Sequence, residues 1–333
     1  MTTPTSGQSI SFSQLKDEFG ATSGSSVSLG AYRITQNVGT LTNRPLDEGV
    51  PQSGTIKASN LQGKQLNVVV DAYSGDNTTR VDASATYAAK QITVIGGFKS
   101  TAQVPSLGAG SRVIVNVNKR IGSAKGNRNY AALKTGSWGT GTTLEVVIGS
   151  SGGIYGGGGD GGSAGSGGSG GSNGNDGSSA LGIQYPTKIT NQGVIVFGRG
   201  GGGGGGGGIG GKCANVQGCQ GCSDTNLSTS GGGGGGGAGY PAGDGVQGAG
   251  QATGTTNGTG ANGTTGESNC GRPVPTGGKG GDGASNGSPG GNTFTTSGGS
   301  AGNDGYAILT DPSASYTLTG NPVAGSTGTG TVL

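Results

Sequence analysis

The chain has 333 residues, of which 84 are glycine, 29% are hydrophobic and 11% are charged. So few hydrophobic residues argue against one conventional core through the whole chain, while so few charges are atypical of a disordered protein. The sequence has no histidine, which removes the common catalytic triads, histidine general bases and most zinc sites, so we expect no enzyme and no cofactor.

The charge is distributed unevenly along the chain. Residues 1–150 carry 14 basic and 8 acidic side chains, a balance of +6, whereas residues 151–333 carry 5 and 8, a balance of −3. The composition changes at the same point, so we predict a domain border near residue 150. Neither balance indicates a nucleic-acid partner. One loose basic cluster fits either a solvated loop or a contact with an anionic polymer, and it consists of Lys119, Arg120, Lys125, Arg128 and Lys134.

Residues 1–63 predict a small module of short helices. Ser11 can cap a helix, with Gln14 at the third helical position as in a capping box. The same spacing of Ile, Ser and Leu recurs further on, at Ile10, Ser13 and Leu15 and at Ile56, Ser59 and Leu61, with a weaker third copy from Val27. Chance similarity between short serine-rich segments is the alternative.

Residues 64–150 predict an all-β domain. Four β-branched runs of strand length are separated by glycine-containing turns, at residues 66–70, 91–95, 112–117 and 143–148. Strands of this number and length fit a small β-sandwich. Trp138, the only tryptophan, precedes the last run and is expected in the core.

Beyond residue 150 glycine recurs at every third position. The longest run has nine consecutive hits, from Gly153 to Gly177, and a shorter one joins Gly299, Gly302 and Gly305. A three-residue period matches the polyproline-II helix, which has three residues per turn. A collagen triple helix is disfavoured, because residues 152–178 contain no proline.

Glycine helices of this geometry can pack closely and satisfy one another's N–H and C=O groups. We therefore predict a polyglycine-II helical sandwich for residues 151–310, the alternative being a flexible Gly/Ser linker. Residues 181–197 interrupt the glycine field and predict a two-stranded element that anchors it, and residues 306–309 predict the closing strand. Residues 311–333 are expected to form a C-terminal tail. The fold class is mainly β: a module of short helices, a β-sandwich-like domain and a glycine-rich sandwich.

All four cysteines lie in the glycine-rich half, at Cys213, Cys219, Cys222 and Cys270. Their spacing is poor for a four-cysteine zinc site, so one or two disulfides are the preferred interpretation, with free thiols as the alternative. Four cysteines allow three pairings, which the sequence leaves open.

Several phrases resemble those of glycine-rich tail-fibre and tail-tip proteins of tailed bacteriophages. They are ISFSQL (10–15), VSL (27–29), GVPQSGTI (49–56), GSWGTGTTL (136–144), TKITNQG (187–193) and DGYAI (304–308), with the glycine run from residue 200. In related phage adhesins with polyglycine-II sandwiches, loops at one edge of the sandwich contact the host receptor. The resemblance therefore implies a structural protein of the virion that displays receptor-binding loops on a glycine-rich scaffold. A purely structural virion part and a glycine-rich ice-binding protein remain the alternatives.

Glycine offers only backbone groups for recognition, so the candidate receptor contacts are larger residues in the segments between the glycine runs. They are Lys212, Tyr240, Arg272, Lys279 and Phe294. The expected partners are a host polysaccharide or outer-membrane protein, and other virion subunits through residues 1–63, where Ile10, Leu15, Phe19 and Leu29 would be buried. A homo-oligomer is expected, with a trimer as the first guess. The N-terminus lacks the features of a signal peptide and no apolar run spans a bilayer, which fits a virion protein made in the host cytoplasm.

Overall fold

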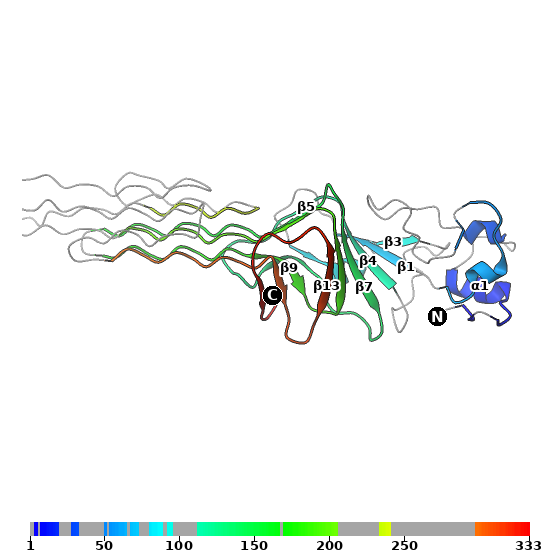
Figure 1. The fold of residues 1–333 in the computed structure, drawn as a ribbon. Coiled ribbons are helices and arrows are strands. Elements are labelled where there is room, and N and C mark those ends of the chain that lie inside the picture. The colour runs from blue at the N-terminus through cyan, green and yellow to red at the C-terminus, as the bar shows by residue number, and fades with distance from the viewer. Residues whose placement is uncertain are drawn as a thin grey trace, which may run out of the picture.

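The structure is a computed structural model, and it describes residues 3–5, 7–19, 28–32, 50–51, 53–64, 67–72, 80–88, 92–95, 112–166, 169–205, 233–240 and 297–333. These residues form an elongated arrangement (Figure 1). The helices of the N-terminal module lie at one end, the strands lie in the middle, and the glycine-rich segments run away from the strands at the opposite end.

The N-terminal module is built from the three related phrases of the sequence. Each one forms a helical turn: α1 (Phe12–Phe19), η1 (Leu29–Tyr32) and η2 (Ala58–Leu61). The predicted capping box is confirmed, because the Gln14 N–H donates to Ser11 Oγ (3.2 Å) and the Ser11 N–H donates to Gln14 Oε1 (2.8 Å). Leu15 and Leu61, at matching positions of two copies, are both buried.

Fourteen strands of the described residues form three sheets. The first sheet has the order β13 (Tyr316–Gly320), β10 (Thr187–Asn191), β7 (Thr143–Ile148), β4 (Arg112–Val117), β1 (Asn67–Asp71) and β3 (Ile92–Ile95). The second sheet has the order β11 (Val194–Val196), β8 (Gly153–Tyr155) and β5 (Arg120–Ile121). The third has the order β14 (Thr327–Thr329), β12 (Ile308–Thr310), β9 (Ser179–Ile183), β6 (Ala131–Lys134) and β2 (Val81–Asp82).

The chain visits the three sheets in rotation, as in β4, β5, β6 and then β7, β8, β9, and successive turns pair in parallel. Only β3 pairs antiparallel among the described strands. This is a three-sided parallel β-helix. Its inward side chains stack in register from turn to turn, so that Ile121, Ile154 and Ile195 form one fully buried column. The burial of such columns is what stabilises the β-helix.

The mainly β class and the four predicted strands are confirmed. The β-sandwich expected for residues 64–150 does not form. The β-branched runs pair in parallel instead, and their strands are covered on both faces. A run of apolar residues does not reveal this difference, because it also fits a strand of a sandwich. The element at 181–197 gives three strands, one in each sheet, instead of two. Residues 308–310 form the strand expected near 306–309, but the expected tail then adds β13 and β14.

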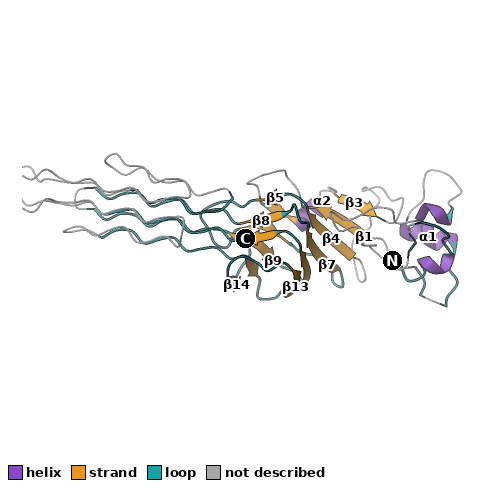
Figure 2. Cartoon of the chain, turned by 45° about the horizontal axis from the view of Figure 1, so that its top comes forward, coloured by secondary structure: helices purple, strands orange, loops and turns teal. Residues whose placement is uncertain are grey.

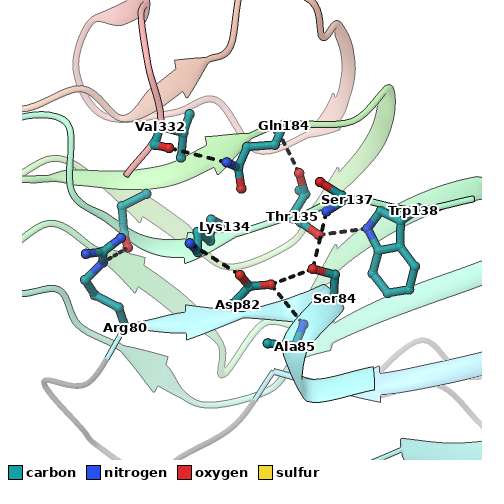
Figure 3. Close-up of polar contacts among 11 residues, drawn as sticks. Arg80, Asp82, Ser84, Ala85, Lys134, Thr135, Ser137, Trp138, Gln184 and Val332 are labelled. Atoms are coloured by element: carbon teal, nitrogen blue, oxygen red, sulfur yellow. Dashed lines mark hydrogen bonds and ion pairs between the residues drawn. The ribbon is translucent and has the colours of Figure 1, made fainter. Parts of the chain in front are cut away.

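The helix α2 (Ala83–Ala88) follows β2 and lies against β1 and β2, and Asp82 caps its N-terminus (Figure 3). Asp82 Oδ1 accepts from the Ala85 N–H (3.0 Å) and the Ser84 hydroxyl (2.8 Å), and Oδ2 lies 3.3 Å from Lys134 Nζ. Burial works to raise the pKa of Asp82, but the two hydrogen bonds and Lys134 outweigh it and hold the pKa below its usual value. Trp138 is half-buried beside this network, and its Nε1–H donates to Thr135 O (2.7 Å).

We expect Asp82→Ala to lower the free energy of unfolding by about 1 kcal/mol near neutral pH, because the α2 cap is lost. Asp82→Asn keeps an acceptor for the cap and should lose less. Since the folded pKa is depressed, the stabilisation is present above the ordinary carboxyl pKa and is lost as pH falls through the folded value. Urea unfolding at neutral and acidic pH measures this, and a deficit for Asp82→Ala that does not shrink in acid would contradict it.

Candidate recognition surface

Two long connections leave the β-helix at the same corner, between the second and third sheets. One joins β8 to β9 and the other joins β11 to β12, in successive turns. Five described segments of these connections run side by side away from the strands (Figures 1 and 2). We call them together the glycine array: residues 156–166, 169–178, 197–205, 233–240 and 297–306.

Hydrogen bonds join the segments of the array at every third residue. The N–H groups of Gly156, Gly159, Gly162 and Gly165 donate to the carbonyls of Val196, Arg199, Gly202 and Gly205 at 2.7–2.8 Å. In the same way Gly171, Gly174 and Gly177 donate to Ser297, Ser300 and Asn303 at 2.8–3.1 Å. A three-residue period of bonds between neighbouring segments confirms the predicted polyglycine-II arrangement.

Residues 197–205 form the central segment, with a neighbour on each of four sides. Gly198, Gly201 and Gly204 donate to residues 169–178 and accept from residues 297–306. The N–H groups of Arg199 and Gly202 donate to residues 233–240, and their carbonyls accept from residues 156–166. A Cβ atom on Gly198, Gly201 or Gly204 would approach a backbone carbonyl closer than 3.0 Å. This enclosure explains the unbroken glycine from Gly200 to Gly205, whereas the outer segments 156–166, 169–178 and 297–306 carry side chains between their glycines.

Short polar side chains satisfy N–H groups on the rim of the array. Asn173 Oδ1 accepts from the Ser300 N–H (2.8 Å), Asp176 Oδ1 from the Asn303 N–H (2.6 Å) and Ser179 Oγ from the Tyr306 N–H (2.9 Å). Both partners advance by three residues at each step, so the side chains follow the helical period. Sequence reasoning missed this ladder, although Asn, Asp and Ser three residues apart beside glycine were its visible signal.

Ion pairs fix the array to the β-helix and to itself. Lys125 Nζ lies 3.2 Å from Asp160, and Arg199 lies 3.8 Å from Asp304, whose other oxygen accepts from the Gly200 N–H (2.9 Å). Two members of the predicted basic cluster, Lys125 and Lys134, are therefore paired with carboxylates.

Tyr240 is the one candidate contact that lies within the described residues. Its N–H donates to Gly156 O (2.9 Å) and its carbonyl accepts from the Ser123 N–H (3.1 Å), which places it where the array meets the β-helix. Its ring meets the Tyr155 ring edge-on at 6.2 Å. Tyr240 is thus far from the distal end of the array, the end away from the strands.

The other candidates lie outside the described residues, and their roles stay predictions: Lys212, Arg272, Lys279, Phe294, Cys213, Cys219, Cys222 and Cys270. The described residues that flank 206–232 are Gly205 and Gly233. Both lie toward the distal end, since Gly205 accepts from Gly165 and the neighbouring Gly234 donates to Gly162. Within the described ranges no group of His, Cys, Asp or Glu could hold a metal ion, and no helix is long and apolar enough to cross a membrane.

Comparison with known proteins gives one family match. A family model described as phage tail fibre adhesin Gp38 matches residues 81–331, well over half of the chain and all of the β-helix from β2 to β14. Among solved structures the chain is similar to the crystal structure of the gp37–gp38 adhesin tip complex of the bacteriophage S16 long tail fiber, with 22% identity, 66% of this chain and 71% of that chain covered, and a TM-score of 0.27. No curated protein matches the sequence.

Proposed function

The chain belongs to the phage tail fibre adhesin Gp38 family, and from this premise we propose that it binds the host receptor at the distal end of the glycine array and docks onto the fibre through residues 1–63. It is a receptor-binding structural protein of the virion tail. The receptor is a host polysaccharide or an outer-membrane protein, and the chain carries out no enzymatic step.

The construction of the array supports this placement of the receptor site. Cross-bonded glycine segments form a stiff support, while a glycine surface itself offers few side chains for specific contact. Loops held on a rigid scaffold are where binding residues concentrate. The segment 206–232, which follows Gly205 at the distal end and carries Lys212, is therefore our first candidate for receptor contact. The second is the chain that precedes Ser297, with Arg272, Lys279 and Phe294.

Binding of the purified chain to host cells tests the proposed function. We expect the chain to bind susceptible cells, to leave resistant mutants unbound, and to compete with phage for adsorption. A purely structural part of the tail would neither bind cells nor compete. Inhibition of ice growth without cell binding would instead support the ice-binding alternative.

The position of the N-terminal module, opposite the array, supports its proposed docking role (Figure 1). Leu15 is 1% exposed, so the chain itself already buries this side chain, and it is not left for burial against another subunit as we expected. Phe12, which is 50% exposed, is a better anchor, with Ile10 and Leu29 half-buried. The side chain of Phe19 lies outside the described residues.

Deleting residues 1–63 should abolish incorporation of the chain into particles. Phe12→Ser should reduce incorporation strongly, since an exposed aromatic anchor contributes about 2 kcal/mol or more at an interface. The matched control is Ser9→Ala, also exposed. Immunoblots of purified particles measure the effect, and normal incorporation of the deletion variant would refute the docking role. The mass of the isolated chain in solution tests the proposed homotrimer.

A further inference from the structure

The outer face of the second sheet carries a strip of aromatic, apolar and basic side chains. Ile121, Ile154 and Ile195 point into the core, so their strand neighbours point outward. The register aligns Arg120, Gly153 and Val194 in one row, and Val194 is 41% exposed. The half-buried Tyr155 ring lies over Gly153, where a Cβ would approach the ring closer than 3.0 Å.

Arg120 stands between two tyrosines of this strip. Its guanidinium carbon lies 5.0 Å from the centre of the Tyr155 ring and 5.2 Å from that of Tyr240. The side chain is exposed, and no carboxylate of the described residues pairs with it. Five other cations do have such partners: Arg112, Lys125, Lys134, Lys188 and Arg199. Arg120 is therefore a positive charge held between two rings, and among the described residues it has no paired carboxylate.

We propose that Arg120, Tyr155 and Tyr240 form a second binding site, for the carboxylate-bearing unit of an acidic saccharide. A guanidinium that stacks on aromatic rings keeps its in-plane N–H donors available for a bidentate carboxylate. The adjoining Tyr155 ring and Val194 offer an apolar surface to the C–H groups of a sugar. The site would hold host glycan chains beside the base of the array. It would thereby raise the local concentration of the host receptor at the distal end of the array.

The distance from the distal end favours a polysaccharide over a protein as the occupant. At roughly 3.1 Å per residue, residues 156–166 alone carry the distal end about 30 Å beyond this site. An extended glycan chain that projects from the cell surface spans such a distance, whereas a short loop of a membrane protein does not. The inference rests on the proposed function for its biological setting, but the binding chemistry is tested separately.

The test is an NMR titration of the full chain with methyl glucuronide, and with methyl glucoside as its uncharged match. We expect shifts of the Arg120 side-chain N–H and Tyr155 ring signals with the glucuronide and much smaller ones with the glucoside. Arg120→Gln should weaken glucuronide binding about tenfold or more, and Arg120→Lys by less. Lys57→Gln, which removes an exposed charge at the other end of the chain, should change nothing.

The proposal would be overturned if these shifts were absent, or if wild type and Arg120→Gln bound both sugars equally. The cluster of Arg120, Tyr155 and Tyr240 would then be only a structural contact between the array and the β-helix. Unchanged protection of the array against trypsin in Arg120→Gln would show that the contact between the array and the β-helix is intact. Failure of the purified chain to bind host cells would refute the proposed function without altering the sugar titration, so the two can fail independently.

Discussion

Replacing Gly201 with alanine should destabilise the glycine array by about 3 kcal/mol or more. Gly201 lies in the central segment, where its N–H donates to Asn175 O (2.9 Å) and an added Cβ would collide with Asp160 O. A backbone carbonyl cannot rotate away as a side chain can, so two segments must separate. The lower entropy of the unfolded alanine chain returns only about 0.4–1 kcal/mol.

Hydrogen exchange of the amides in residues 156–178 measures this effect. We expect exchange to become faster by about two orders of magnitude in Gly201→Ala, since array opening becomes that much less costly. Ser163→Ala is the matched control, because Ser163 is exposed on an outer segment and its backbone bonds remain. Equal protection in the two variants would mean that the segments are not packed backbone against backbone.

Exchanging Lys212–Ser230 and Glu267–Thr276 for Gly/Ser links of equal length should reduce adsorption to host cells by about 100-fold or more, as expected for the loss of hot-spot side chains. The array should stay folded, because every described bond between its segments involves other residues. A phage that carries the exchanged fibre provides the measurement, with hydrogen exchange as the check of folding.

A matched exchange at the other side of the molecule controls for this variant. Thr317 and Thr319 are exposed on β13, and Thr→Ser changes there should leave adsorption intact. Unchanged adsorption in the loop exchange, with the array protected, would move the receptor site to the β-helix or to another protein.

Local features of the fold could be predicted from the sequence because their physical signals are local. The capping box at Ser11 and Gln14 needs only a three-residue spacing, and it is present. The period of three from Gly153 to Gly177 follows from close packing at one side of a helix with three residues per turn, and the bonds confirm it.

The arrangement of the strands could not be predicted, because it depends on pairings between distant residues. Val115, Val146 and Ile189 stack in one column, although 74 positions separate the first from the last (189 − 115). The same apolar run fits a strand of a parallel β-helix and a strand of a sandwich, so it does not tell the two folds apart. The glycine segments are inserted at one corner of two successive turns, and the sheets continue across residue 150. The change in composition at residue 150 therefore does not coincide with a border between sheets.

The position of Tyr240 also depends on contacts between distant residues, so it could not be predicted from the sequence. An aromatic residue after a glycine run indicates an interface, but the sequence does not tell which end of the array it occupies. The structure places it at the base beside Tyr155 and Arg120, a contact between residues 120 positions apart (240 − 120). Reassignment of Tyr240 from the distal contact to the proposed saccharide site follows from this position.

The central claim is that the receptor is touched at the distal end of the array, and photocrosslinking tests it most directly. Ser166 is exposed at the distal turn, where its carbonyl accepts from the Ser169 N–H (3.0 Å), and Ser137 is exposed on the β-helix. Benzoylphenylalanine replaces each in turn, and the fibre is irradiated on host cells. We predict a covalent adduct with a host surface molecule from Ser166→benzoylphenylalanine and none from Ser137→benzoylphenylalanine. An adduct from position 137 alone would contradict the account.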